Sequence, residues 1–128
     1  MKLLLDTSVL LWIIFEERKK LSAKALEALN ASEEVLLSVV SIWEISIKYS
    51  IGKLKLKENP KKWIPSLIPQ LGFQILPVLE THALTILDLP LHHRDPFDRL
   101  LIAQSKSENI PLISSDGIFK EYDVECVW

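Results

Sequence analysis

Three scarcities narrow what this chain of 128 residues can be. Cysteine occurs once, at Cys126, so no disulfide can form within the chain, and a reducing compartment such as the cytoplasm is expected. No apolar run is long enough for a signal peptide or a membrane span: Asp6 ends the first leucine run, and Pro65, Pro69 and Gly72 interrupt the longest uncharged stretch. We therefore expect a cytoplasmic protein that does not enter the membrane.

An excess of charge of one sign is also missing. The formal net charge is −2, so no broad basic field indicates nucleic-acid binding. This does not exclude a polyanionic partner, because carboxylates committed to a metal site would leave the rest of the chain slightly basic. Hydrophobic residues make up 48% and charged residues 25% of the chain, as in ordinary globular proteins. The length predicts a single domain over residues 1–128.

Apolar runs of strand length alternate with longer segments of helical period. We predict strands over residues 2–5, 35–38, 73–78 and 111–114, with a possible fifth over 123–127, and helices over 8–17, 21–29, 39–51, 59–71, 80–87 and 95–109. Gly52 is expected to cap the end of one helix, and Asp95-Pro96 to begin another. Strands that alternate with helices predict an α/β fold, in which a parallel sheet of four to five strands is sandwiched between helices.

Four acidic residues stand at the end of an apolar run or inside one: Asp6, Glu44, Asp98 and Asp116. Glu44 is the sharpest case, because at helical spacing it shares one stripe with Val40, Ile47 and Ile51. Burying a lone ionised carboxylate costs several kcal/mol unless it is paired or binds a cation. Four such groups indicate a site for a divalent metal ion.

The predicted topology can bring these acids together. Asp6 follows the first strand and Asp116 follows the fourth, while Glu44 and Asp98 lie in helices next to strands. Ligands of open parallel sheets bind beyond the carboxyl ends of the strands, where the strand order reverses. Oxygen ligands without a cysteine cluster favour Mg²⁺ or Mn²⁺, and such an ion can activate water against a phosphodiester. The adjacent pair His92-His93 lacks helical ligand spacing and is predicted to be exposed in a loop.

Each acid also has a structural interpretation that the sequence leaves open. Asp6 can be a helix N-cap, and Asp98 can favour the positive end of its helix. Asp116-Gly117 is a favourable turn dipeptide, and Glu44 can pair with Lys48 at spacing i, i+4. The joint pattern is harder to explain structurally than any of its members.

Other polar residues are near enough in sequence to assist. Thr7, Ser114 and Ser115 can orient an acid, a water or a phosphate, and Arg99 can orient Asp98. Candidates for contact with substrate phosphates are Lys48, Lys53, Arg94 and Arg99.

Several segments match a known pattern, and the chain resembles the PIN-domain ribonucleases of the VapC type, the toxins of bacterial and archaeal toxin–antitoxin pairs. The matching segments are Leu3–Ser8, Ser41–Ile45 with Gly52–Leu54, His93–Gln104 and Leu112–Asp116. The family often has threonine where this chain has Ser114, which keeps the hydroxyl.

The resemblance implies a fold, an activity and partners. It implies a PIN-like α/β/α fold and cleavage of RNA that depends on Mg²⁺ or Mn²⁺. Asp6, Glu44, Asp98 and Asp116 would be the metal-binding and catalytic residues. Such toxins usually form homodimers and are held inactive by a cognate antitoxin, which inserts a segment into the groove of the active site.

Two other functions are weighed against this one. A phosphotransfer enzyme of the same fold class fits poorly, because one such class needs Asp-x-Asp after the first strand and this chain has Ser8 at the second position. A metal-stabilised binding module without catalytic activity, acting through a protein partner, is compatible with the sequence.

Overall fold

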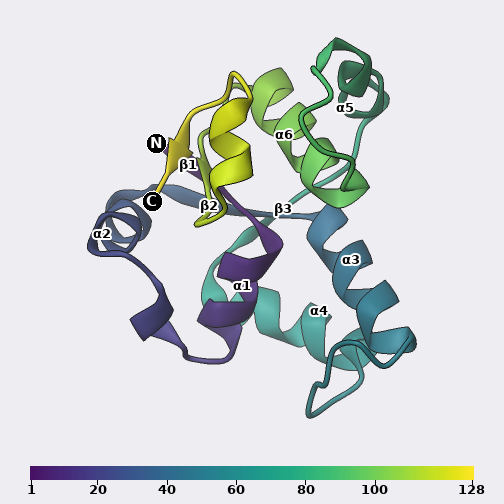
Figure 1. Cartoon of the computed structure of the whole chain (residues 1–128). Helices are drawn as coiled ribbons and strands as arrows, with labels where there is room; N and C mark the ends of the chain where they lie inside the picture. Colours follow the sequence, from purple (N-terminus) through teal and green to yellow (C-terminus); the bar gives the residue numbers. More distant parts are fainter.

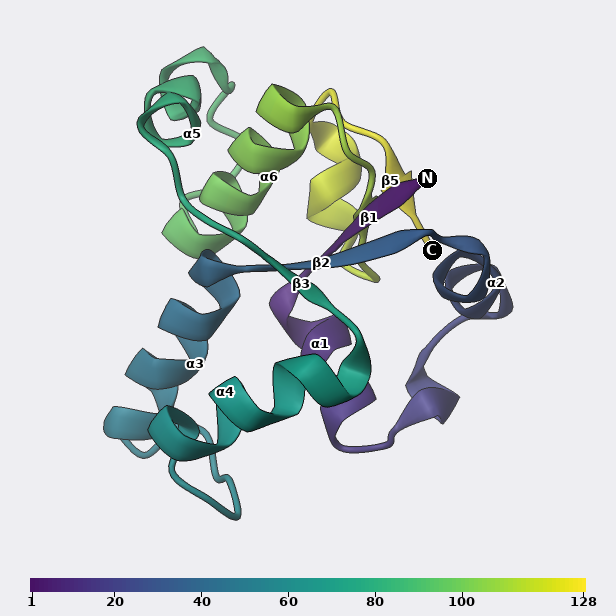
Figure 2. The ribbon, with the colours of Figure 1, turned by 180° about the vertical axis from the view of Figure 1, so that it is seen from behind.

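The computed structural model describes all residues, 1–128. Five parallel strands form one sheet in the order β3-β2-β1-β4-β5 (Figures 1 and 2). The strands are β1 (Lys2–Leu5), β2 (Glu34–Ser38), β3 (Gln74–Leu76), β4 (Leu112–Ile113) and β5 (Cys126–Val127). The predicted α/β fold with a parallel sheet is confirmed.

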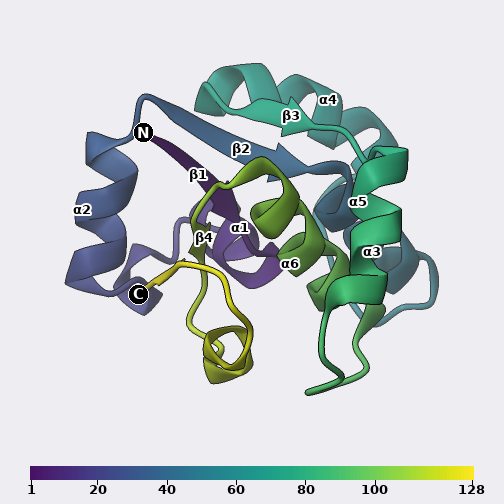
Figure 3. The same cartoon turned by 90° about the horizontal axis from the view of Figure 1, so that it is seen from above.

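Six α-helices cover the two faces of this sheet. They are α1 (Thr7–Ile14), α2 (Ala23–Ala31), α3 (Val39–Ser50), α4 (Pro60–Leu71), α5 (Glu80–Thr85) and α6 (Pro96–Glu108). Short 3₁₀ turns are η1 (Arg18–Lys20), η2 (Ile86–Asp88) and η3 (Gly117–Glu121). In Figure 3, α2 lies at the end of the sheet that holds both termini, and α3 and α5 lie on the opposite side. None of these helices is long and apolar enough to span a bilayer.

The alternation of side chains along the strands divides the core into two layers. Leu4, Leu36 and Leu112 belong to the cluster that α6 and η3 cover. Their neighbours Leu5 and Leu37 belong to the opposite cluster, against α1, α2 and α4. Because successive side chains of a strand point to opposite faces, strands that are apolar throughout must be covered on both faces. This explains why the strands read as continuous apolar runs.

Short polar side chains set where the helices begin. Asp6, Ser22 and Asp95 each accept a hydrogen bond from a backbone N–H in the first turn of α1, α2 and α6. Helix α2 therefore begins at Ala23, two residues later than the apolar spacing predicts. Helix α1 ends at Ile14, three residues earlier than predicted, and the chain then reaches φ +57° at Glu16.

The ends of other elements also follow from local conformation. Gly52 has φ +76° and directly follows the last turn of α3, as its predicted capping role requires. Strands β4 and β5 have two residues each, fewer than predicted. Their backbone pairing continues past the strand end, since Ser114 N donates to Val127 O at 3.2 Å.

A buried polar network ties α6 to its neighbours. Gln104 is fully buried; its Oε1 accepts from Ser38 Oγ at 2.5 Å and its Nε2 donates to Pro77 O at 3.2 Å. His82, also fully buried, accepts at Nδ1 from Leu79 N and contacts Glu108 Oε2 through Nε2, both at 3.0 Å. These contacts fix α6 against the end of β2 and the segment that leads into α5.

The order of the strands determines where a site can form. Strand β1 is followed along the chain by β2 on one side, whereas β4 pairs with its other side. The strand order therefore reverses between β1 and β4, and Asp6 and Ser114 directly follow these two strands.

Candidate active site

A cleft of about 260 Å³ opens beyond the carboxyl ends of β1 and β4. All four predicted acids line it, although they come from four separate segments of the chain. The remaining lining residues are Thr7, Ser8, Trp12, Ser115 and Phe119. The fold thus gathers Asp6, Glu44, Asp98 and Asp116 at the point where the strand order reverses.

Asp6 is the most constrained of the four. Its side chain is almost fully buried, and its Oδ1 accepts from Val9 N at 2.7 Å, so Asp6 is the N-cap of α1. A hydrogen bond with Ser114 also favours its ionised form. Burial outweighs these bonds and, with the negative charges of Asp116 and Glu44, raises the pKa of Asp6 to about 6. The residue is both a cap and an acid of the cleft.

Asp98 lies in the first turn of α6, where Asp95 caps the helix by accepting from Phe97 N and Asp98 N. Partial burial, followed by the negative charge of Asp95, raises the pKa of Asp98 to about 6. His93 opposes this shift, since its Nε2 lies 3.2 Å from Asp98 Oδ2. Glu44 adds a smaller repulsion across the cleft.

Glu44 and Asp116 combine a structural contact with a place in the cleft. Glu44 is buried, and its Oε2 accepts from Lys48 Nζ at 2.5 Å, the i, i+4 pair that the sequence left open. Asp116 is exposed, and its Oδ1 accepts from Ile118 N at 3.0 Å and so caps η3. Glu44 and Asp116 therefore both make the structural contacts that the sequence left open and line the cleft.

The supporting residues have different positions. Ser115 lines the cleft, and Ser114 is buried, where its Oγ accepts from Asp116 N at 3.1 Å. Thr7 donates its hydroxyl to Ser41 Oγ at 2.9 Å. The guanidinium of Arg99 does not contact Asp98; it donates to Pro90 O at 2.9 Å and to the hydroxyl of Tyr122 at 3.0 Å.

Sequence reasoning missed His93 and Trp12. His93 was predicted to be exposed, but it is largely covered and contacts Asp98. Trp12 lines the cleft and packs against Trp128, with ring centroids 5.8 Å apart. The position of His93 five residues before Asp98 is the one local signal that could have indicated its role.

The chemistry of the donor set fits a hard divalent cation. The cleft offers carboxylate oxygens, which Mg²⁺ and Mn²⁺ prefer, and mutual repulsion in it disfavours full ionisation, which a cation would relieve. No three of the His, Cys, Asp and Glu side chains come close enough together to hold an ion as they stand. Binding by three of them needs a change in side-chain conformation, such as release of Glu44 from Lys48.

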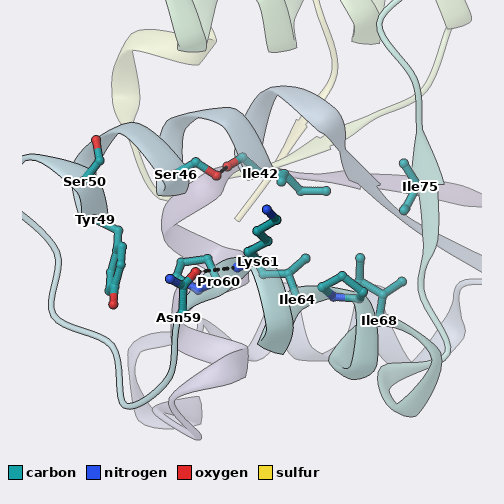
Figure 4. A pocket seen from close by; sticks show the side chains of 11 residues that line it. Ile42, Ser46, Tyr49, Ser50, Asn59, Pro60, Lys61, Ile64, Ile68 and Ile75 are labelled. Carbon is teal, nitrogen blue, oxygen red and sulfur yellow. Dashed lines mark hydrogen bonds between the residues drawn. The ribbon is translucent and has the colours of Figure 1, made fainter.

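A larger groove of about 600 Å³ lies elsewhere, between α3, α4 and β3 (Figure 4). Figure 4 shows the side chains of Ile42, Ile64 and Ile68 facing into it. Glu44 is two residues from Ile42, about 200° around the helix, so it faces away from this groove. The groove holds none of the four acids, and the acid chemistry is confined to the smaller cleft.

Comparisons with known proteins agree with this architecture. A family model described as PIN domain matches residues 3–125. A chain of VapBC2 from Rickettsia felis bound to a DNA fragment from the promoter aligns with a TM-score of 0.72 and 17% identity, over 98% of this chain and 97% of that one. A chain of DNA-bound VapBC from Salmonella typhimurium aligns with a TM-score of 0.72 and 14% identity, over 98% of this chain and 96% of that one.

FitAcB from Neisseria gonorrhoeae gives a TM-score of 0.67 and 21% identity, over 97% of this chain and 95% of that chain. No curated protein matches the chain. At these identities the likeness to solved structures is one of fold. The family model spans nearly the whole chain, and this protein therefore belongs to the PIN-domain family.

Proposed function

We propose that the protein is a metal-dependent endoribonuclease, the VapC-type toxin of a toxin–antitoxin pair. It hydrolyses RNA phosphodiester bonds at Asp6, Glu44, Asp98 and Asp116 with Mg²⁺ or Mn²⁺. The observation that carries the proposal is the gathering of these acids, from four segments, in one cleft at the reversal of strand order. Membership of the PIN-domain family, whose members are nucleases, supports it.

The residues of the cleft divide the work. Asp6 and Asp98 would be the principal ligands of the ion, Glu44 would assist or act as a base, and Asp116 would support a second ion or a water network. The bound ion would supply an activated water and offset the charge of the phosphodiester transition state. Lys48, released from Glu44, becomes available to a substrate phosphate at the rim of the cleft.

Two protein partners belong to the proposal. Several solved structures of similar fold are toxin–antitoxin complexes, which supports a cognate antitoxin that occupies the active-site groove. A homodimer is the expected assembly. Its candidate interface includes three exposed leucines that lie near one another in sequence, Leu84, Leu87 and Leu91, which are 55%, 83% and 65% exposed; we refer to these three residues as the leucine surface. Such a protein would act in the cytoplasm, where its RNA substrates are.

Cleavage of total RNA by the purified protein, freed of any copurifying partner, tests the activity. We expect discrete fragments with Mg²⁺ or Mn²⁺, none with EDTA, and none from Asp98→Asn in any buffer. The matched control is Asp88→Asn, an exposed aspartate outside the cleft, which should cleave like the native protein. Normal cleavage by folded Asp98→Asn would show that Asp98 is not catalytic and would contradict the proposed site.

The second candidate is a metal-stabilised binding module without catalytic activity, which acts through a protein partner and would use the same four acids. If the native protein binds Mn²⁺ and a partner protein but cleaves no RNA from a total extract, the binding module replaces the nuclease.

A further inference from the structure

His93 is held at both nitrogens of its ring. Nδ1 lies 2.8 Å from the hydroxyl of Tyr122, and Nε2 lies 3.2 Å from Asp98 Oδ2. The same Tyr122 hydroxyl accepts from the backbone N–H of His93 at 3.3 Å and from Arg99 at 3.0 Å. Tyr122 is almost fully buried, so this hydroxyl has a fixed set of partners.

The partners of Tyr122 determine which nitrogen of His93 carries the proton. A phenolic oxygen has two acceptor sites and one hydrogen. The N–H groups of Arg99 and of the His93 backbone occupy the two acceptor sites, so the hydrogen of Tyr122 is directed to Nδ1 of His93. Nδ1 is then an acceptor without a proton, and Nε2 of the neutral ring carries the hydrogen. That hydrogen points at Asp98 Oδ2.

We propose that His93 is a positioning residue for Asp98, with Tyr122 and Arg99 fixing its tautomer. The Nε2–H group holds Oδ2 of the carboxylate of Asp98, a residue that lines the cleft, and Oδ1 has no hydrogen bond within the chain. Hydrogen bonds from neighbouring side chains orient carboxylate ligands and tune their affinity for a metal ion. The inference rests on the proposed function, since it assigns Asp98 to the metal site.

The contrast with Glu44 shows why a neutral donor suits this position. Glu44 is paired with the ammonium of Lys48, a full positive charge that opposes a cation at the same carboxylate. An imidazole that donates from Nε2 without an added proton orients Asp98 without adding such a charge. His92, the adjacent residue, is exposed and packs only its ring against Tyr122, with centroids 4.9 Å apart. His92 therefore offers a matched control.

Two measurements on the full chain test the assignment. The first is the ¹⁵N spectrum of the histidine rings at pH 8 without metal, which separates protonated from unprotonated ring nitrogens. We expect His93 to be protonated at Nε2 in the native protein, and Tyr122→Phe to shift its signals toward a mixture of tautomers. A native His93 protonated at Nδ1 would overturn the proposal. This readout depends on neither metal nor activity.

The second measurement is the affinity for Mn²⁺, from electron paramagnetic resonance of the free ion. We expect His93→Ala to weaken binding roughly ten- to hundredfold. His93→Gln, which retains an N–H donor near the position of Nε2, should recover most of the loss, and His92→Ala should bind like the native protein. Glutamine restores the N–H donor but not the shape of the imidazole ring. Recovery of Mn²⁺ affinity by His93→Gln would therefore show that the hydrogen bond to Asp98 matters, rather than the packing of the ring.

The outcomes distinguish a failure of the positioning role of His93 from a failure of the proposed metal site. If native protein binds Mn²⁺ through Asp98 and His93→Ala binds equally well, the positioning role is wrong and the proposed function stands. If the native protein binds no Mn²⁺, the metal site fails and the positioning role fails with it. Loss of affinity in His93→Ala that His93→Gln does not restore also contradicts the assigned hydrogen bond.

Discussion

Asp6 is an N-cap and a cleft carboxylate at once, and these two roles place opposite demands on its charge. The cap is strongest when the carboxylate is ionised, because it accepts from Val9 N at the positive end of α1. The cleft disfavours the ionised form, because Asp6 is buried near Asp116 and Glu44. The raised pKa of Asp6 means that burial and the neighbouring negative charges outweigh the cap, so the ionised carboxylate has a cost in the metal-free protein, which a bound cation would relieve.

This cost predicts how the stability of the metal-free protein depends on pH. The pKa of Asp6 is raised from 3.8 to about 6, so between these values the folded chain binds more protons than the unfolded chain. Stability therefore falls as pH rises through this window and is level above it. Asp6→Asn, which keeps an N-cap acceptor, should be more stable than the native protein at pH 8 by up to about 3 kcal/mol.

Urea unfolding in EDTA at pH 4 and pH 8 measures this difference. The advantage of Asp6→Asn should be present at pH 8 and mostly gone at pH 4, near the lower end of this window, where the folded carboxyl is protonated and the unfolded one partly so. Asp123→Asn, at an exposed position, is the control and should show no such dependence. Equal stability of Asp6→Asn and the native protein at pH 8 would mean that the cleft does not burden this carboxylate.

The sequence indicated some residues of the site and not others, and the reason is sequence distance. The four acids were visible because each interrupts or ends an apolar pattern, and the pair of Glu44 with Lys48 was visible because i, i+4 contacts are local. The contact of His93 with Tyr122 joins residues 29 positions apart. The residues next to His93 in sequence give no indication that the hydroxyl of Tyr122 contacts its ring.

At the scale of elements, capping residues determined where the helices begin more closely than apolar periodicity did. Apolar spacing located α2 correctly but placed its start at Leu21, whereas the hydroxyl of Ser22 accepts from Ala25 N and begins the helix at Ala23. Asp95-Pro96 located the start of α6 because it carries its own cap and a proline at the first helical position. Helix boundaries were predictable where such a signal was recognised.

Gln104 connects three elements, and its removal should show how much they depend on it. Gln104→Ala leaves the buried hydroxyl of Ser38 and the carbonyl of Pro77 without this partner, and it opens a cavity beside α6. We expect a loss of roughly 2–4 kcal/mol in the free energy of unfolding by urea. Gln70→Ala, an exposed glutamine of α4, is the matched control and should change it by under about 0.5 kcal/mol. A loss for Gln104→Ala no larger than that for Gln70→Ala would show that the network does not stabilise the fold.

At the scale of the whole molecule, alternating strands and helices predicted the fold class but not the strand order. The order β3-β2-β1-β4-β5 depends on long-range pairings, such as Leu4 with Leu112, which periodicity does not record. The gathering of the acids depends on this order, because Asp6 and Asp116 meet only if β1 and β4 are neighbours. The site was therefore predicted through a topological rule rather than through any local signal.

The leucine surface carries the prediction that belongs to the whole molecule. Leu87 is 83% exposed, more than any other large hydrophobic residue of the chain, and Leu84 and Leu91 are exposed beside it in sequence. The net charge is only −2, so two copies repel each other weakly. If this surface forms a two-fold interface, each substitution enters it twice. Leu87→Glu should then weaken the dimer at least about tenfold, because two carboxylates must be desolvated.

Light scattering across a range of protein concentrations measures the dimer of each variant. Ile51→Glu is the control, since Ile51 is 59% exposed at the end of α3, outside the leucine surface, and its substitution adds the same charge. A dimer that Leu87→Glu dissociates and Ile51→Glu does not would place the interface beside α5. A dimer that survives Leu87→Glu would contradict the leucine surface as the interface, and a monomeric native protein would remove the homodimer from the proposal. The cleft would be unaffected by either result, because all four acids that line it come from one copy of the chain.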